Sequence, residues 1–472
     1  EEDGRFSFAH ELVWQVVYKA LSTARRRSLH LRAGEALEMV HKEQTYEVAA
    51  ELAHHFCQAE QWQRALDYLI AAGERAKEAY ANREALKFFR EAERLAEAME
   101  SKGYEQSRLW EKRFDLLAMR CSIYTTIYDI LEAKSHLTKD VEAMVDLAGR
   151  LGDRLRLAQA RKTRAEIWFA LGRHQEALEE TRQALEIMRE LRERRGEGEA
   201  LTNLGAFHVQ SGECMRGLEY FRQASQLYEE IGDRTEQAHS LRRIGILYDI
   251  LAQYIQAKEY YERAYSIYEE IGDIEGQGAV LNNLGLLQHV AGDYIAAMKS
   301  YEQALQQSRE SGDLKLQGTV LINMGALHND LKQYRRGLER LEGALKIAKE
   351  PGMKGLKVEA LSQRAIAYLG LGEKAKALDC SSSAVKLLEG GRYLVEAHLI
   401  FFNQFRVLAA SGSEKEAAVY LEKAYNELMR KASEIKDASM RETFLRGAKV
   451  SRQITEEWER IRQRLQSEAP SP

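Results

Sequence analysis

Proline, cysteine and excess positive charge are all scarce in this chain of 472 residues. The first of its three prolines is Pro351, so everything before it can be helical, because no residue there lacks a backbone hydrogen-bond donor. The net charge of −4 argues against direct binding of nucleic acid, which depends on a basic surface. No apolar run approaches the roughly 18–20 residues of a membrane-spanning helix, so we expect no membrane partner.

The four cysteines are far apart in the sequence, at Cys57, Cys121, Cys214 and Cys380. Such spacing is typical of reduced, buried thiols, which predicts a cytoplasmic protein. Charged residues make up 30% of the chain and hydrophobic residues 45%, a balance that suits a folded, helix-rich protein. The chain begins at Glu1 and not at a methionine, and we expect it to be a piece of a longer protein.

A repeat with a period of forty residues runs through most of the chain. One register holds alanine at seven successive steps: Ala184, Ala224, Ala264, Ala304, Ala344, Ala384 and Ala424. A second register holds glycine at four steps and then alanine: Gly205, Gly245, Gly285, Gly325 and Ala365. Agreement at this level does not arise by chance, so the chain is built from copies of one unit.

Each period predicts two helices joined by a short loop. In one period the first helix carries Leu201, Leu204 and Gly205, with apolar or small residues three and four positions apart. The second helix carries Phe221 and Ala224 and ends at a Gly-Asp pair, and glycine just past a helix is the expected left-handed cap. We expect the small residues where helices cross, because only small side chains permit that approach.

The pattern resembles the tetratricopeptide repeat (TPR) family, in a long form of forty residues, at six positions of each unit: Leu201, Leu204, Gly205, Gly217, Phe221 and Ala224. The resemblance is strong from about 155 to 430 and implies an all-α, right-handed superhelical solenoid of helical hairpins. No hairpin can bury its apolar face alone, so stability comes from stacking. The family's proline near the end of the second helix is replaced by Glu229, and its first large aromatic by leucine, which fits longer helices.

Repeat regularity divides the chain into four predicted segments. Residues 1–45 form a helical segment that resembles the end of a winged-helix or linker region, and residues 46–153 hold divergent helical repeats. Residues 154–430 hold the regular array, and residues 431–472 hold capping helices and a tail. Apolar residues of the last segment are expected to cover the end of the array: Phe444, Leu445, Val450, Ile454 and Trp458.

Both ends of the chain resemble signal-transduction ATPases with numerous domains (STAND ATPases). The start carries Phe6-Ser7-Phe8-Ala9-His10, an aromatic-rich helix, and then Arg25-Arg26-Arg27 ahead of Leu29-His30, which is similar to the segment after their nucleotide-binding and winged-helix domains. The tail from Asp437 to Leu445 is similar to their closing segment. The resemblance implies an ATPase domain before Glu1 in the same chain, with this array as its sensor arm.

We predict that the chain itself is not an enzyme and holds no cofactor and no metal. No Gly-x-x-x-x-Gly-Lys-Ser/Thr loop is present to cradle phosphates, so we expect no nucleotide turnover by that route. His54, His55 and Cys57 invite a metal site, but zinc needs three or four ligands and no second cluster lies nearby in sequence. The run Ser381-Ser382-Ser383 has no identifiable base beside it.

Two further patterns have competing interpretations. Tyr254, Tyr294 and Tyr334 recur just after the inter-helix loop, and we expect them to pack in the stack and not to form a platform for bases. The basic run Arg25–Arg27 is expected at a solvated helix start or against the ATPase domain, in preference to phosphate or lipid.

The best functional signal is a row of polar residues that recurs two positions before the helix-crossing glycine: Asn203, Arg243, Asn283 and Asn323. In the TPR family this position faces the concave groove, and an amide offers a donor and an acceptor to the backbone of an extended peptide. The alternative is that stacking geometry favours polar residues there. The predicted ligand site adds four nearby polar residues: Arg242, Asn282, His289 and Asn329.

These features predict a protein- or peptide-binding sensor or scaffold. The first hypothesis is the regulatory arm of a STAND-type ATPase. The alternatives are a stand-alone adaptor that assembles other proteins, and the regulatory array of a larger enzyme such as a kinase or a cyclase. The sequence before Glu1 separates them, since it would hold a phosphate-binding loop, nothing, or a catalytic domain.

Overall fold

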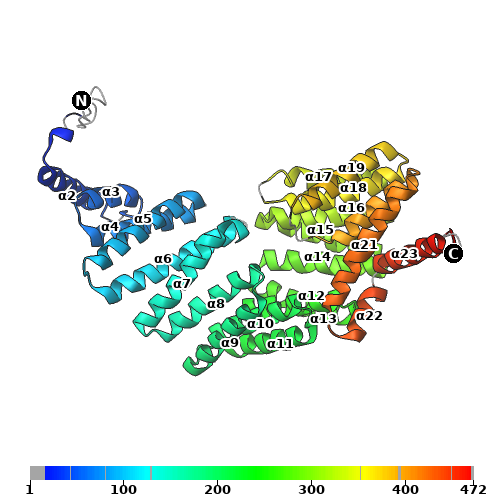
Figure 1. Cartoon of the computed structure of the whole chain (residues 1–472), viewed down its shortest axis with the longest axis horizontal. Helices are drawn as coiled ribbons and strands as arrows, with labels where there is room; N and C mark the ends of the chain where they lie inside the picture. Colours follow the sequence, from blue (N-terminus) through cyan, green and yellow to red (C-terminus); the bar gives the residue numbers. More distant parts are fainter. Residues whose placement is uncertain are drawn as a thin grey trace. The chain divides into compact units, whose positions relative to one another are not determined.

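A computed structural model of the chain describes residues 16, 18–42, 44–79, 81–127, 130–350, 352–391, 395–447 and 449–468. These residues form helices and turns, and no strand occurs among them, which confirms the all-α solenoid of hairpins (Figure 1). The chain separates into two compact units, Glu1–Arg192 and Glu193–Pro472. The four segments defined by repeat regularity remain a prediction, and Phe6–His10 lies outside the described residues.

Unit 1 stacks helices that each pack on the next one in the chain. They are α2 (Thr23–Val40), α3 (Ala49–Gln58), α4 (Trp62–Glu78), α5 (Asn82–Ser101), α6 (Gln106–Ile127), α7 (Ile130–Leu151), α8 (Arg154–Ala170) and α9 (His174–Leu191). The basic run on α2 is engaged within this unit, because Arg27 pairs with Glu60 and Arg26 lies over the ring of Tyr18.

Unit 2 begins with five regular hairpins, which a sixth helix pair and two further helices follow. The hairpins are α10–α11 (Arg194–Gln210, Cys214–Ile231), α12–α13 (Arg234–Ile250, Tyr254–Ile271), α14–α15 (Ile274–Ala291, Tyr294–Ser311), α16–α17 (Leu314–Asp330, Tyr334–Ile347) and α18–α19 (Lys354–Gly370, Lys374–Glu389). They are followed by α20 (Ala397–Ala410), α21 (Glu414–Glu434), α22 (Ala438–Gly447) and α23 (Lys449–Glu468).

The Gly-Asp junctions end one hairpin and begin the next. Gly232 adopts the left-handed conformation at φ 72°, which glycine reaches without steric cost, and it closes α11. The following Asp233 caps α12, because its carboxylate accepts a hydrogen bond from the backbone N–H of Glu236. The next two junctions repeat both features, so the predicted glycine caps are confirmed.

The recurrent glycine of the first helix lies where the two helices of a hairpin cross. A methyl group on Gly245 would stand 2.6 Å from the ring of Tyr261, and one on Gly285 would stand 2.7 Å from the ring of Tyr301. The helices can approach this closely only because glycine has no side chain, as the sequence predicted. Tyr254 and Tyr294 are also packed against the apolar core, in agreement with their predicted role.

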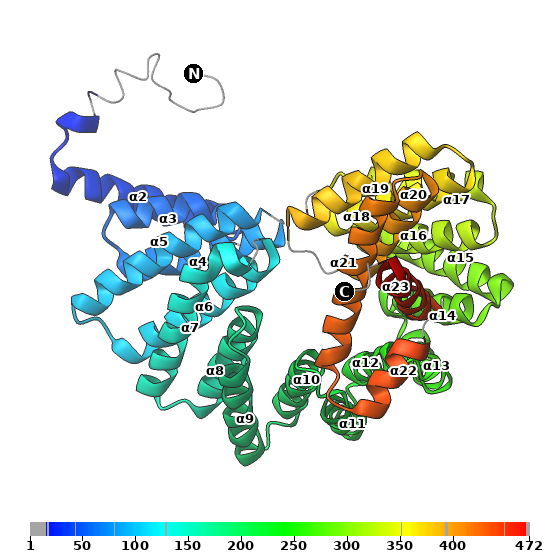
Figure 2. The same ribbon diagram turned by 45° about the vertical axis from the view of Figure 1, so that its right-hand side comes forward.

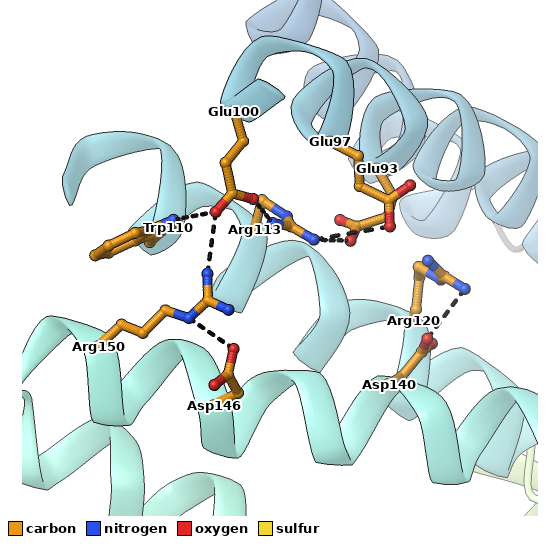
Figure 3. A network of polar contacts seen from close by, with 9 residues as sticks. All are labelled: Glu93, Glu97, Glu100, Trp110, Arg113, Arg120, Asp140, Asp146 and Arg150. Carbon is orange, nitrogen blue, oxygen red and sulfur yellow. Dashed lines mark hydrogen bonds and ion pairs between the residues drawn. The ribbon is translucent and has the colours of Figure 1, made fainter. Parts of the chain in front are cut away.

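Arg113 of α6 is the centre of a polar network in unit 1 (Figure 3). Its Nη2 atom lies 2.8 Å from Glu93 Oε1 and 3.8 Å from Glu97 Oε1, and its Nη1 atom pairs with Glu100. The Arg113 and Glu93 side chains are each only 11% exposed. Glu100 also accepts from Arg150 of α7 at 3.1 Å, so the network ties α5, α6 and α7 together.

Three histidines meet where α2 packs on α3. The Nδ1 atoms of His30 and His55 lie 2.9 Å apart. The ring centroid of His54 lies 5.6 Å from the ring centroid of His30 and 5.6 Å from that of His55. The hydroxyl of Tyr18 lies 2.8 Å from Nε2 of His30. Burial, and then the charges of His55 and His54, lower the pKa of His30; burial and His54 lower the pKa of His55, while Glu51 opposes the change.

Acidification should therefore loosen α2. Histidine in an unfolded chain titrates near pH 6.5, and both folded values lie below it, so protonation favours the undocked state. The docking should be fully present above about pH 6.5 and should be lost as the pH falls below it. Hydrogen exchange of Thr23–Val40, corrected for the intrinsic effect of pH, measures this. The variant His30→Gln should weaken the dependence, and equal protection on both sides of pH 6.5 would contradict it.

Candidate functional site

The even-numbered helices line the inner face of unit 2. Each of α12, α14, α16 and α18 contacts the next even-numbered helix as well as its own hairpin partner. The odd-numbered helices α11, α13 and α15 contact mainly their neighbours in sequence. Elements on the inside of a curved stack approach one another more closely, so the even-numbered helices carry the concave face, as Figure 2 shows.

Part of the predicted polar row connects successive hairpins. Asn323 of α16 donates from Nδ2 to Oδ1 of Asn282 on α14, at 2.9 Å. Two hairpins further along, Asn403 of α20 donates in the same way to the hydroxyl of Ser362 on α18, at 3.0 Å. Both pairs join residues 41 positions apart, so the polar row reaches back by one repeat plus one residue. At these positions the stacking interpretation applies.

Arg243 and Asn283 differ from Asn323 because neither forms a hydrogen bond or an ion pair within the described part of the chain. Arg243 on α12 is exposed, and Asn283 on α14 is half-buried, as is Asn203 on α10. Desolvation by the surrounding protein, and then the nearby charge of Arg242, lower the pKa of Arg243. Arg243 thus stands on one of the inner helices, and its guanidinium donors have no hydrogen-bond partner among the described residues.

Three more charged groups of the even-numbered helices also lack a hydrogen-bonding partner among the described residues. Burial alone raises the pKa of Asp249 on α12 to about 6, and burial and then Glu396 raise the pKa of Glu359 on α18 to about 7. Arg406 on α20 is exposed and desolvated, which lowers its pKa. Such groups gain from a ligand that brings hydrogen bonds or the opposite charge.

The other predicted site residues have partners within the stack. Arg242 bonds to the hydroxyl of Tyr268 on α13, and Asn329 donates to the backbone carbonyl of Gln363 at 3.0 Å. His289 of α14 lies 3.1 Å from Asp330 of α16, another pair 41 positions apart. The structure thus brings Arg243 and Asn283 to the open face on neighbouring helices and places Arg242, Asn282 and Asn329 against other protein groups.

The described residues were compared with the requirements of a metal site and of a membrane-spanning helix. Within them, no three His, Cys, Asp or Glu side chains converge in a way that could hold a metal ion. None of their helices has both the length and the apolar character needed to cross a membrane. The four cysteines are free thiols; Cys121, Cys214 and Cys380 are buried and Cys57 is half-buried.

Comparison with known families matches the regular hairpins of unit 2. The tetratricopeptide repeat family matches residues 196–270, which span α10–α13, and again residues 279–311, which span most of α14 and α15. The chain carries tetratricopeptide repeats. Tetratricopeptide repeats are protein-binding modules, and residues 196–311 supply such repeats. No curated protein matches it in sequence.

Solved structures with the same TPR fold share little sequence with the chain. A Signal Transduction ATPase with Numerous Domains (STAND) protein with a TPR sensor from Pyrococcus horikoshii is 14% identical, with a TM-score of 0.52 over 93% of this chain and 68% of that one. Aspartyl phosphate phosphatase F from Bacillus subtilis is 14% identical, with a TM-score of 0.51 over 79% and 96%. The apo form of the quorum sensor NprR from B. thuringiensis is 13% identical, with a TM-score of 0.51 over 78% and 99%. At these identities the likeness establishes the fold alone.

Sequence reasoning missed Asp249, Glu359 and Arg406. Each lies on a first helix of a hairpin but outside the predicted row, at three different repeat positions. Asp249 lies six positions after Arg243, Arg406 lies three positions after Asn403, and Glu359 lies four positions before Gln363. A search of a single repeat position therefore could not find them.

Proposed function

We propose that the inner face of unit 2 binds an extended peptide or a peptide segment of a protein, and that the chain is the sensor arm of a STAND-type ATPase. The observation that carries the proposal is the pair of open groups, Arg243 and Asn283, on neighbouring inner helices. A peptide backbone supplies a donor and an acceptor for the amide, and a carboxylate supplies the partner for the guanidinium.

Both ends of the chain and one structural neighbour support the STAND assignment. The terminal segments around Arg25–His30 and Asp437–Leu445 resemble STAND proteins, and a STAND protein with a TPR sensor shares the fold over most of this chain. Two other solved structures with a similar fold are a phosphatase and a quorum sensor. The gene sequence upstream of Glu1 separates the three hypotheses. A phosphate-binding loop there supports the STAND-type ATPase. A catalytic domain favours the regulatory array of an enzyme, and neither feature favours an adaptor.

Peptide selection tests the groove directly. Peptides displayed on phage are selected on the purified chain and their affinities are measured for the double variant Arg243→Ala/Asn283→Ala. Loss of one charge-assisted and one neutral hydrogen bond should cost about 2 kcal/mol or more, which is roughly thirtyfold in affinity. Because both side chains lie at the open face, stability should change by less than about 0.5 kcal/mol.

The variant Asn323→Ala is the matched control. It removes an amide from the same repeat position, but it leaves Asn282, which is 8% exposed, without its partner. That should cost about 1–3 kcal/mol of stability and leave peptide affinity nearly unchanged. If the double variant keeps full affinity while Asn323→Ala loses it, the groove assignment is wrong.

A further inference from the structure

The stack of unit 2 closes on itself through its C-terminal helices. Helix α21 packs on α20, and its C-terminal end reaches the loop between α10 and α11 at the other end of the unit (Figure 2). The backbone N–H of Lys436 donates to the carbonyl oxygen of Gly212 at 3.1 Å, and its ammonium group pairs with Glu213. The ion pair joins residues 223 positions apart, so the first and last parts of the unit touch.

Glu213 is the anchor on the array side. Its carboxylate also lies 2.7 Å from Nδ1 of His208 on α10 and 3.0 Å from Nη1 of Arg216 on α11. The hydrogen bond from Lys436, and then those from His208 and Arg216, hold the pKa of Glu213 at about 2 against the effect of burial. The anchor therefore stays charged at neutral pH, and Lys436 meets a preorganised acceptor.

The corner between α21 and α22 is built by side-chain hydrogen bonds. Ile435 is buried in an extended conformation, and Arg441 donates to its carbonyl oxygen from Nε at 3.0 Å and from Nη2 at 2.9 Å. Asp437 caps α22 by accepting from the backbone N–H of Met440 at 2.9 Å. The geometry of the corner is thus fixed by its own residues.

Helix α22, which follows this corner, packs on α20 and α21 through Phe444 and Leu445 but is lightly held on the side of the first hairpins. No residue of α22 is buried, although Met440 packs against the apolar cluster that contains Cys214, and Gly447 lies against Ala252. Helix α23 is firmly anchored on the other side, because Ile454 is fully buried against α20 and α21. The start of α23 lies near the end of α16, since the charge of Lys449 contributes to lowering the pKa of Asp330, after the larger effect of His289.

We propose that Ile435–Gly447 is a strap that holds the ring of unit 2 closed and controls access to its inner face. The anchored helices α21 and α23 keep the strap in place, while its light contacts at Gly212, Glu213 and Ala252 let it detach. The control of access rests on the proposed function, since that function supplies the ligand. Detachment of the strap is measurable without any ligand.

The loop glycines offer a release variant with a matched control. A methyl group on Gly212 would stand 1.3 Å from the carbonyl oxygen of Glu434, so Gly212→Ala should displace the strap from this loop. Gly292 holds the same loop position with the same left-handed backbone, φ 83° against 77°, and nothing lies within 4 Å of a methyl group there. Ala252 already adopts this conformation in its own loop, at φ 54°, so alanine does not destroy the turn.

Access is measured as the rate at which a thiol in Asn283→Cys reacts with a polymer-linked maleimide, with peptide mapping to separate it from the native cysteines. If the open form is a minor state of roughly 0.1–10%, Gly212→Ala should accelerate the reaction at least about tenfold, and Gly292→Ala should not. A small reagent, iodoacetamide, should show little difference among the variants. Equal maleimide rates for Gly212→Ala and Gly292→Ala would overturn the proposal.

The opposite change provides an independent arm. Glu213→Cys/Lys436→Cys should form a disulfide, because the backbone N–H of Lys436 donates to the carbonyl oxygen of Gly212, directly before Glu213, and so brings the two backbones together. This lock should slow the maleimide reaction until it is reduced. Failure of the disulfide to form, or a locked ring that reacts as fast as the released one, would overturn the proposal. These rates are measured without any peptide, so failure of the strap and failure of the groove are distinguishable.

Discussion

Replacing Arg113 with methionine should destabilise unit 1 by about 3–5 kcal/mol, because it leaves buried carboxylates without their cation. Glu93, at 2.8 Å from the guanidinium, is 8% exposed and has no other ion-pair partner among the described residues. Glu100 would lose one of its two arginines. Methionine fills much of the same volume, so the loss reports charge and not a cavity.

Tryptophan fluorescence during urea unfolding measures this effect, since Trp62, Trp110 and Trp168 all lie in unit 1. Arg150→Met is the control: that side chain also pairs with Glu100, but it is 47% exposed, and such pairs contribute about 0–1 kcal/mol. The double variant Arg113→Met/Glu93→Leu should recover much of the stability, because an apolar pair replaces a buried ionic one. Equal losses for Arg113→Met and Arg150→Met would contradict the assignment of Arg113 as the centre of the network.

Tyr301→Ala should cost about 3–5 kcal/mol in unit 2. The Tyr301 side chain is fully buried against Gly285 at the crossing of α14 and α15, and its removal leaves a cavity that two rigid helices cannot close. Because repeat arrays couple mainly nearest neighbours, hydrogen exchange should accelerate in α14, α15 and the adjoining hairpins. Uniform acceleration along the whole chain would contradict this local coupling.

Tyr301→Phe separates the ring from its hydroxyl. The hydroxyl is buried and has no hydrogen-bond partner among the described groups, so its removal should be neutral or stabilising. A loss of more than about 1 kcal/mol would show that the hydroxyl has a partner, such as an ordered water.

The sequence predicts the hairpins well because their determinants are local. Gly245 faces the ring of Tyr261 only sixteen positions later, and Gly232 caps the helix that precedes it, so both are visible in one period of the repeat. The apolar residues of α22 and α23 that were expected to cover the end of the array do so: Phe444, Leu445, Val450, Ile454 and Trp458 pack with α20 and α21.

The candidate site is less predictable because it depends on the offset between repeats. A row of equivalent residues aligns at 40 positions, but the structure pairs Asn323 with Asn282 and His289 with Asp330, at 41. That extra residue comes from the rotation of each hairpin on the last, which periodicity does not contain. It moves Asn323 into the stack while leaving Arg243 and Asn283 open.

Contacts between the ends of unit 2 were not predictable at all. Lys436 and Glu213 are one basic and one acidic residue among many, and only the accumulated curvature of the intervening hairpins brings them together. The network of Arg113 is hidden for a different reason, since Glu93, Glu97 and Glu100 look like an ordinary solvated helix face until α6 packs on α5.

Photo-cross-linking of a selected peptide to the intact chain tests the central claim most directly. A peptide that carries a photoreactive residue should cross-link to α12 and α14 beside Arg243 and Asn283, and the double variant Arg243→Ala/Asn283→Ala should lose the cross-links. Cross-links confined to the odd-numbered helices or to unit 1, unchanged in the double variant, would contradict the account.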